Sequence, residues 1–294
     1  MTEKQVRKTI NYELLKKGGF MRQKQKGYFS LRLQVVGGTL TSENIRVINE
    51  VADKYGHGYV HLTSRQGVEI PFISAYDIDD VRNELAKGGV TPGVCGPRVR
   101  TVTACQGNEI CPSGCINTQE LARELSARYF GRELPHKFKL GVTGCSNNCL
   151  KAEENDLGIK GGMDVVYDKT KCKKCKVCVR ACLSGALSKD AEGYVVKDDA
   201  KCTRCGRCAR VCSFDCWSGA CGYRISFGGT FGNCIRRGEE MVPLVKDKEM
   251  LFRIVDATLD YFNEHAKPGE RFRKTLERLG DEEFRSIINA VFRG

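Results

Sequence analysis

Two runs of four cysteines constrain the fold of this chain more than any other feature. Both runs have the spacing C-x2-C-x2-C-x3-C, over residues 172–182 and again over residues 202–212. Four thiolates hold one [4Fe–4S] cluster, and in two-cluster proteins the fourth cysteine of each run binds the other cluster. The spacing therefore predicts one cluster on Cys172, Cys175, Cys178 and Cys212, and another on Cys202, Cys205, Cys208 and Cys182.

A pair of zinc sites is the alternative for these cysteines, because zinc also binds four thiolates. Two copies of one unbroken spacing favour iron–sulfur clusters over zinc. Leu183 and Ser213 replace the proline that usually follows the fourth cysteine in bacterial ferredoxins, which is a small departure. We expect residues 167–218 to be an inserted bacterial-type ferredoxin domain, since their composition differs from both flanks.

The cysteine count also bears on the cellular compartment. The chain has 17 cysteines in 294 residues, and its start lacks the apolar stretch of a signal peptide. No segment approaches the about 18 uncharged apolar residues of a membrane span. We therefore expect a cytoplasmic protein with no membrane partner, whose thiols are kept reduced.

Hydrophobic periodicity predicts an α+β fold around the cysteine-dense segment. We expect a basic helical arm over residues 1–19 and a ferredoxin-like βαββα half domain over residues 20–90. Residues 91–166 and 219–246 are expected to form a second α+β domain, which the cysteine runs interrupt. Residues 247–294 are predicted to close the chain as two or three amphipathic helices.

The half domain can be read element by element. Strand alternation over residues 28–35 turns Phe29 and Leu31 inward and leaves Arg32 pointing away from the core. A helix is predicted over residues 42–55, with Ile45, Ile48, Val51 and Ala52 on its buried face. Further predictions are hairpin strands at 59–62 and 67–70, a helix carrying Ile78, Val81 and Leu85 that ends at Gly88, and a helix over 117–130 in the next domain.

Four further cysteines form a second paired arrangement outside the two runs. Cys105-x5-Cys111 is followed, thirty-three residues later, by Cys145-x3-Cys149. Their spacing alone is compatible with a zinc site, a third iron–sulfur cluster or four unrelated core thiols.

The residues around these cysteines resemble the signature of the sirohaem-dependent sulfite and nitrite reductases. The motifs are Thr-Ala-Cys-Gln-Gly-Asn at 103–108, Leu-Pro-His-Lys-Phe-Lys at 134–139, Thr-Gly-Cys-Ser-Asn-Asn-Cys at 143–149, His-Leu-Thr-Ser-Arg-Gln at 61–66 and Asn-Asp-Leu-Gly-Ile at 155–159. The resemblance covers about residues 20–245. Together with the inserted cysteine runs, it is strongest to the anaerobic, dissimilatory-type sulfite reductases, in the subunit that carries an inserted ferredoxin domain.

The resemblance implies a fold and a cofactor set. The chain is similar to one sulfite reductase half, in which a ferredoxin-like half domain is joined to a sirohaem/[4Fe–4S] domain. By this likeness Cys105, Cys111, Cys145 and Cys149 hold a [4Fe–4S] cluster, and Cys149 bridges it to the sirohaem iron. The implied cofactors are therefore sirohaem and three [4Fe–4S] clusters.

The resemblance also assigns basic residues to the substrate. Arg32, Arg100, Lys137 and Lys139 match the four cations that surround the oxyanion in this family. Strand alternation over residues 137–143 independently places Lys137 and Lys139 on one face. Arg98, two residues before Arg100, is an alternative counterpart.

Other polar residues match cofactor contacts of the family. Thr63, Arg65, Gln66 and Asn147 correspond to positions that touch the haem carboxylates and ring. His136 adjoins Lys137 and is a weaker candidate for moving protons. Five cysteines match no ligand pattern and are expected to be structural thiols: Cys95, Cys115, Cys216, Cys221 and Cys234.

The function implied by the resemblance is six-electron reduction of sulfite to sulfide, with electrons supplied through the two ferredoxin-type clusters. A sirohaem nitrite reductase that forms ammonia is one alternative, and a non-catalytic iron–sulfur electron-transfer subunit is another. A nucleic-acid-binding protein would also suit the basic composition, but no helix-turn-helix or RNA-binding motif is found.

The charge of the chain fits this cofactor set. Lys and Arg number 48 against 36 Asp and Glu, which gives a net charge of +12 and calls for acidic partners. Sirohaem carboxylates, anionic clusters and a small oxyanion, either sulfite or nitrite, supply most of the opposite charge, so no nucleic-acid partner is expected. In the family one site is built between two homologous halves. We therefore expect a homodimer or a pairing with a related subunit, together with an electron-donor protein.

Overall fold

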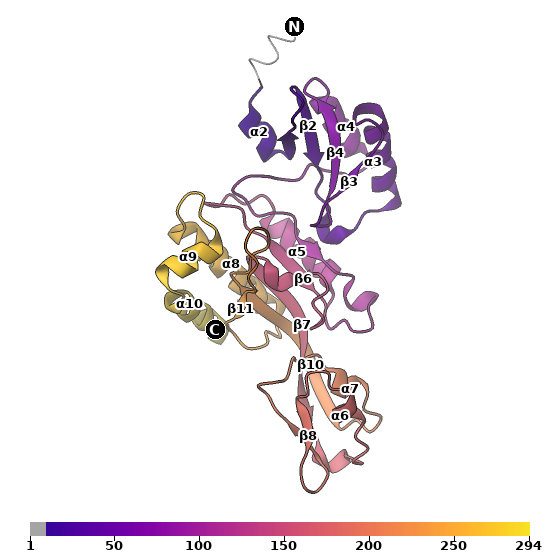
Figure 1. Cartoon of the computed structure of the whole chain (residues 1–294), viewed down its shortest axis with the longest axis vertical. Coiled ribbons are helices and arrows are strands. Elements are labelled where there is room, and N and C mark those ends of the chain that lie inside the picture. Colours follow the sequence, from indigo (N-terminus) through magenta and orange to yellow (C-terminus); the bar gives the residue numbers. More distant parts are fainter. Residues whose placement is uncertain (1–9) are drawn as a thin grey trace. The chain divides into compact units, whose positions relative to one another are not determined.

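The computed structural model of the chain describes residues 10–294 (Figure 1). Nine of the nineteen residues of the predicted basic arm, residues 1–9, lie outside the described residues. Within the described part, helix α2 (Tyr12–Lys17) begins at Asn11, whose side chain accepts a hydrogen bond from the amide of Leu14, and ends at Gly18. No helix among residues 10–294 is long and apolar enough to cross a membrane.

The chain divides into two compact units, which are described separately. Unit 1 contains residues 10–104, 120–140 and 262–275, and unit 2 contains residues 105–119, 141–261 and 276–294. The division follows packing rather than chain order, because both units are assembled from three separate stretches of sequence.

Unit 1 is built on a four-stranded antiparallel sheet. Its order is β1 (Phe20–Arg22), β2 (Tyr28–Arg32), β4 (Val68–Ser74) and β3 (His61–Leu62). Helices α3 (Ser42–Tyr55) and α4 (Ile78–Lys87) pack together, and their apolar residues share one core with the sheet. The predicted helix bounds at 42–55 and before Gly88 are confirmed, and strand β1 is an addition to the predicted βαββα order.

Helix α3 begins at a capping box, and its buried face differs from the predicted one at one position. Thr41 and Asn44 form a reciprocal capping box at its start, in which each side chain bonds the other residue's backbone amide. The predicted buried face was wrong at Ile45, which is 56% exposed, and Val47 is buried in its place. The reason is that Val47 packs against Gly88, where a β-carbon would lie 2.4 Å from the Val47 side chain.

The rest of unit 1 contains strand β5 (Thr103–Ala104) and most of helix α5 (Thr118–Tyr129), which confirms the predicted helix over 117–130 within a residue. Phe138 is fully buried against Phe262 and Phe272, which come from the C-terminal helices α8 (Lys248–His265) and α9 (Phe272–Leu279). These contacts hold the segment that carries Lys137 and Lys139.

Unit 2 contains a long antiparallel hairpin, β7 (Leu157–Tyr167) with β10 (Trp217–Phe227), flanked by β6 (Leu140–Thr143) and β11 (Glu239–Glu240). The register of the hairpin is unbroken from Leu157 opposite Phe227 to Tyr167 opposite Trp217. The predicted return of strand character near Tyr223 therefore begins six residues earlier. Helix α10 (Glu282–Arg293) packs Phe284 against Phe227 of the hairpin.

Residues 168–216, between the paired ends of the hairpin, hold both cysteine runs. We call this stretch the cysteine-rich segment. It contains helices α6 (Val177–Ala181) and α7 (Arg207–Arg210), the short strand pair β8 (Leu187–Lys189) and β9 (Val195–Lys197), and a small apolar cluster around Leu187, Val195 and Trp217 (Figure 1).

The predicted strand over residues 137–143 is only partly a regular strand. Strand β6 begins at Leu140, and Phe138 makes an isolated parallel bridge with Val99. The alternation still holds, because Phe138, Leu140 and Val142 are fully buried while Lys137 and Lys139 are partly exposed.

Candidate functional site

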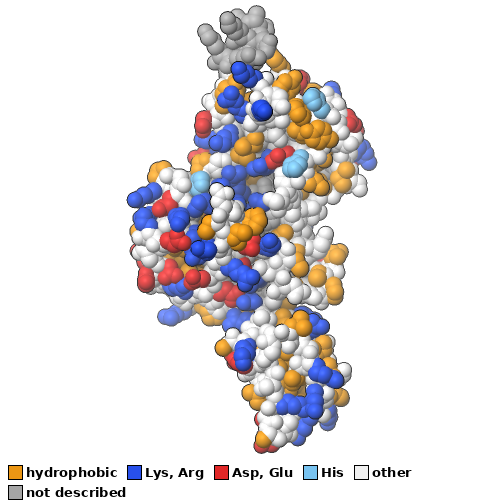
Figure 2. Space-filling model, in the orientation of Figure 1, with side chains coloured by type: hydrophobic (Ala, Val, Ile, Leu, Met, Phe, Trp, Pro, Cys, Tyr) orange, Lys and Arg blue, Asp and Glu red, His pale blue; other side chains and the backbone are white. Residues whose placement is uncertain are grey.

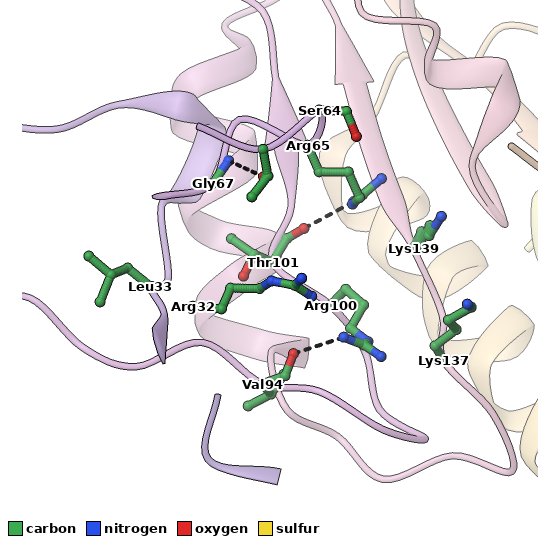
Figure 3. Close-up of a pocket in the computed structure, with 11 residues that line it drawn as sticks. Arg32, Leu33, Ser64, Arg65, Gly67, Val94, Arg100, Thr101, Lys137 and Lys139 are labelled. Carbon is green, nitrogen blue, oxygen red and sulfur yellow. Dashed lines mark hydrogen bonds between the residues drawn. The ribbon is translucent and has the colours of Figure 1, made fainter. Parts of the chain in front are cut away.

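A basic cavity of about 260 Å³ lies in unit 1 (Figure 3). All four basic residues predicted to surround the substrate line it, together with two of the predicted haem contacts. The lining residues are Arg32, Leu33, Thr63, Ser64, Arg65, Gly67, Val94, Arg100, Thr101, Lys137 and Lys139. A cavity of this size, smaller than a site for a drug-sized ligand, suits a small anion.

Arg32 enters this cavity from the end of strand β2. Its Nε and Nη2 atoms both donate to Oε1 of Glu69, its register partner on β4, at 2.8 and 2.5 Å. Nη1 donates to the sulfur of Cys95 at 3.5 Å. The forked contact with Glu69 fixes the plane of the guanidinium, as expected for an arginine that must present its remaining donors to an anion.

Arg100 is held by backbone oxygens instead of a carboxylate. Its Nη1 and Nη2 atoms donate to the carbonyls of Val94 and Gly96, both at 3.0 Å, and its buried Nε has no hydrogen-bond partner. Burial lowers the pKa of Arg100 from its ordinary value. Arg98 does not line the cavity and pairs with Glu133 at 2.6 Å, so the geometry favours Arg100 over Arg98.

Lys137 and Lys139 reach the cavity from the segment leading into β6, and Figure 3 shows their side chains from the same stretch of chain. Their neighbour His136 does not line the cavity. Burial, and then the positive charge of Lys137, lower the pKa of His136, so its imidazole is neutral at pH 7. A neutral imidazole is a poor proton donor to an oxyanion, which favours the lysines as proton donors.

The four predicted haem contacts differ in their partners and in whether they line the cavity. Thr63 closes the β3–β4 turn by accepting a hydrogen bond from the amide of Gly67, and Arg65 donates to the carbonyls of Thr101 and Leu140. Gln66 forms two hydrogen bonds with the backbone of Ala104, at 2.9 and 3.0 Å, and does not line the cavity. The structure therefore gives Gln66 a bracing role on the residue that precedes Cys105. Asn147 belongs to unit 2.

Cys95 was expected to be a structural thiol, and it is buried. Its sulfur nevertheless contacts Arg32 at 3.5 Å and interacts electrostatically with Arg100. Cys95 therefore lies between the two arginines of the cavity. No sequence motif marks this position, because the contact depends on the packing of distant segments.

The paired cysteines Cys105, Cys111, Cys145 and Cys149 all lie in unit 2. The sulfur of Cys105 accepts a hydrogen bond from the amide of Gly144 at 3.1 Å, which joins the two halves of the set. Burial raises the pKa of Cys145, and the thiols of Cys111, Cys115 and Cys149 raise it further. Cys149 is exposed, whereas Cys145 is buried.

The first cysteine run forms a compact thiol site. A small cavity is lined by Cys172, Cys175 and Cys178 together with Cys212 from the second run, which is the crossed arrangement expected from the spacing. Cys216 lines the same cavity, and it is buried beside Cys212 and Cys172.

Five thiols therefore surround this cavity, and their pKa values separate Cys212 from Cys216. Burial opposes the ionisation of Cys212, but hydrogen bonds from the amides of Phe214 and Cys216 bring its pKa below the ordinary value. Burial raises the pKa of Cys216 to about 12. Since metals bind the thiolate, Cys212 is the better ligand of the two.

The second run also brings three of its thiols together. The thiols of Cys202, Cys205 and Cys208 interact with one another, and burial raises the pKa of Cys208 to about 11. A larger cavity of about 530 Å³ is lined by Cys205, by Leu183 beside Cys182, and by Cys145 and Asn147 of the paired set. The second run therefore lies beside the loop that carries Cys145.

The donor sets fit iron–sulfur clusters better than zinc. Among residues 10–294 no three His, Cys, Asp or Glu side chains converge closely enough to hold one metal ion, as zinc would require with its about 2.3 Å bonds to sulfur. In a cubane each iron takes a single cysteine, so the thiolates stand further apart. The Arg and Lys side chains of the basic cavity fit carboxylates or an oxyanion.

Comparisons with known proteins agree with these features. Residues 95–293 match the family described as "Nitrite and sulphite reductase 4Fe-4S domain", and residues 21–88 match the "Nitrite/Sulfite reductase ferredoxin-like half domain". The chain is 31% identical, over 94% of its length, to 44% of the coenzyme F420-dependent sulfite reductase of Methanocaldococcus jannaschii. It is 30% identical, over 59% of its length, to 56% of one subunit of the anaerobic sulfite reductase of Salmonella typhimurium.

Solved structures show the same fold. A dissimilatory sulfite reductase I structure superposes with a TM-score of 0.72 at 21% identity, over 89% of this chain and 69% of that one. The NirA protein of Mycobacterium tuberculosis gives 0.69 at 14% identity, over 98% and 48%. The chain spans about half the length of the first two curated relatives. The two family matches, which together cover most of residues 21–293, show that the chain belongs to the nitrite and sulfite reductase family.

Proposed function

We propose that this chain is a catalytic subunit that reduces sulfite to sulfide with six electrons at a sirohaem. The observation that carries the proposal is the convergence of Arg32, Arg100, Lys137 and Lys139 on one small cavity, in a chain of this family. Glu69 already neutralises Arg32, and the remaining positive charge around a cavity of this size favours a bound anion.

The protein groups have separable tasks in this reaction. Arg32, held by Glu69, and Arg100, held by two carbonyls, present fixed positive charge to the sulfite oxygens. Lys137 and Lys139 donate protons to the sulfite oxygens, which leave as water. Solvent then reprotonates both lysines. In total, six electrons and seven protons convert the sulfite dianion to hydrosulfide and three waters.

We assign the cofactors to the residues that fit them. Sirohaem, when bound, would supply the electrons for the reduction, and Arg65 and Thr63 would be the candidates to hold its carboxylates. In unit 2, the exposed residue Cys149 would be a ligand of the iron cofactors. Three [4Fe–4S] clusters would occupy the paired set and the two crossed sets of the cysteine-rich segment.

The visible spectrum of the anaerobically purified chain tests this proposal. Sirohaem gives sharp chlorin bands, whereas iron–sulfur clusters alone give broad absorption. Absence of an extractable tetrahydroporphyrin would leave a non-catalytic electron-transfer subunit as the function. Turnover with a chemical reductant and each anion then separates the two substrates, and faster turnover of nitrite at low concentration would make nitrite the substrate.

We also propose that the working enzyme pairs this chain with a second copy or a related subunit. The family builds one site from two homologous halves, and residues 21–293 match a single ferredoxin-like half domain and a single 4Fe-4S domain. Sedimentation of the cofactor-loaded protein tests the pairing. An active monomer that retains sirohaem would contradict it.

A further inference from the structure

The two cysteine runs fold alike but face different surroundings. At the second and fourth positions after the first cysteine, the backbone is left-handed in both runs, at Lys174 and Lys176 in the first and at Arg204 and Gly206 in the second. A short helix follows in each run. The runs therefore act as two copies of one motif, and differences between equivalent positions report on what each copy contacts.

The second run faces the protein. Ser146, next to Cys145, donates to the carbonyl of Thr203 at 2.7 Å, and Arg224 donates to the same carbonyl at 2.8 Å. Arg210 donates to the carbonyl of Cys205 and lies 3.8 Å from the sulfur of Cys115. These bonds join the second run to the loops that carry the paired cysteine set.

The fourth residue after the first cysteine is also buried in the second run and exposed in the first. Gly206 is buried, and a β-carbon there would lie 2.8 Å from the sulfur of Met163. Its equivalent Lys176 is exposed and keeps a left-handed φ of 69°. Glycine would adopt this conformation without the steric cost of about 1–2 kcal/mol that other residues pay. The close approach of Met163 explains the glycine at 206, but nothing in the described part of the fold requires lysine at 176.

The outer face of the first run is strongly basic. Residues 169–180 contain six basic residues and no acidic residue. All six are exposed, as is Cys175, and besides Lys169 they are Lys171, Lys173, Lys174, Lys176 and Arg180. Figure 2 shows blue Lys and Arg side chains gathered on the cysteine-rich segment, with few acidic ones between them. We call these five residues the basic collar.

Part of the collar has partners within the chain. Lys171 forms a long ion pair with Asp168 at 3.8 Å, and the ammonium group of Lys174 lies 4.1 Å from the centre of the Tyr194 ring. Lys173 and Lys176 flank Cys175, and both are exposed. A basic run is usually only a solvated surface, but this one surrounds an exposed thiol of a predicted cluster site.

We infer that the basic collar is the docking surface for an acidic one-electron carrier protein. The inference rests on the proposed function, because it takes Cys175 to be a ligand of the outer cluster. Electron-transfer encounters bury little surface and depend on charge complementarity for their association rate. The carrier would deliver one electron at a time, with its own redox centre oxidised as the chain is reduced.

The test uses a double variant, K173Q/K176G, of the full cofactor-loaded chain. K176G removes a charge and also relieves the left-handed backbone, so the change favours folding. The matched control is K24Q/K26Q, which removes two exposed lysines from unit 1. The probe is an acidic low-potential ferredoxin, and its oxidised form is used to measure binding without turnover.

We expect the association rate of K173Q/K176G with the oxidised ferredoxin to fall about tenfold at low ionic strength. The difference should shrink as salt approaches 0.15 M, where the Debye length is about 8 Å. K24Q/K26Q should remain within about twofold of the unmodified chain. Iron content and the cluster spectrum should be unchanged in both variants.

The inference would be overturned by equal association rates for K173Q/K176G and the unmodified chain at low salt, or by an equal loss in the K24Q/K26Q control. Equally tight binding of a DNA duplex at the collar would overturn it too. Loss of iron from K173Q/K176G would also overturn it, because the collar would then serve the cluster rather than a partner. Binding is measured without sulfite, so a failure of the proposed function shows separately, as absent sirohaem or absent turnover.

Discussion

Arg32 and Glu69 form a cross-strand ion pair at the edge of the basic cavity, with Nη2 of Arg32 2.5 Å from Oε1 of Glu69. The partners face each other across β2 and β4, so the sheet register itself sets the direction of the guanidinium. This pairing makes Glu69 a positioning residue for the cavity, although no cavity-lining motif includes it.

Glu69→Gln should lower kcat/KM for sulfite about tenfold. Arg32 would lose its charged anchor and sample several rotamers, which costs about 1.4 kcal/mol of transition-state stabilisation. The substitution also removes the repulsion between the Glu69 carboxylate and the anion. This gain offsets the loss of transition-state stabilisation only weakly, because Arg32 already neutralises Glu69. Steady-state kinetics measure the effect, with Glu43→Gln in the exposed Glu43–Arg46 pair as control. Unchanged kinetics in E69Q would remove Glu69 from the site.

Arg100→Gln and Arg98→Gln should differ sharply. Arg100 lines the cavity, so its loss should reduce kcat/KM by about a hundredfold or more, as for other preorganised donors to an oxyanion. Arg98 pairs with Glu133, and its loss should stay within about threefold, since exposed ion pairs contribute little. The reverse order of effects would show that Arg98 is the substrate residue.

Lys137→Gln should lower kcat about a hundredfold, since it removes a proton donor from the cavity. His136→Gln is the neighbouring control and should change kcat by less than about threefold. Burial lowers the pKa of His136, so its neutral form predominates at pH 7 in the unmodified chain. A large loss of kcat in H136Q with little loss in K137Q would assign the proton transfer to His136.

Cys212→Ser should remove one cluster, whereas Cys216→Ser should leave all clusters in place. Both thiols line the same cavity, but only Cys212 has a lowered pKa. The iron content, counting the sirohaem iron, should therefore fall from about thirteen to about nine atoms per chain in C212S and stay near thirteen in C216S. Retention of all iron in C212S with loss in C216S would exchange their roles.

The buried Lys160 should make stability depend on pH. Burial, and then the charge of Arg224, lower its pKa to about 8, despite ion pairs with Glu153 and Glu240. Between pH 8 and the ordinary value of 10.5, the unfolded chain binds a proton that the folded chain does not, so stability rises with pH. Below pH 8 both states are protonated, and this gain in stability is absent.

Lys160→Met provides the matched comparison, because methionine has similar length and does not titrate. The free energy of unfolding of the unmodified chain, minus that of K160M, should increase by about 2 kcal/mol from pH 7 to pH 10. Urea unfolding at several pH values in that range measures it. A constant or decreasing difference would show that Lys160 is not destabilised by burial.

Patterns among residues close together in the sequence predicted several helix bounds and the members of the basic cavity. The apolar periodicity over residues 42–55 and the glycine at 88 predicted helix bounds that the structure confirms, because those signals act within a few residues of each other. Motif residues also predicted the members of the basic cavity, and Arg32, Arg100, Lys137 and Lys139 do line one cavity.

Tertiary structure alone decided which remote residues meet. Cys95 lies against Arg32, Gln66 braces Ala104, and Cys216 joins Cys212 around one cavity, and none of these contacts follows from a short-range pattern. The exposure of Ile45 was likewise decided by the fit of Val47 against Gly88. Periodicity specifies which face of an element is apolar, but the neighbour that covers each side chain depends on close packing between segments that are distant along the chain.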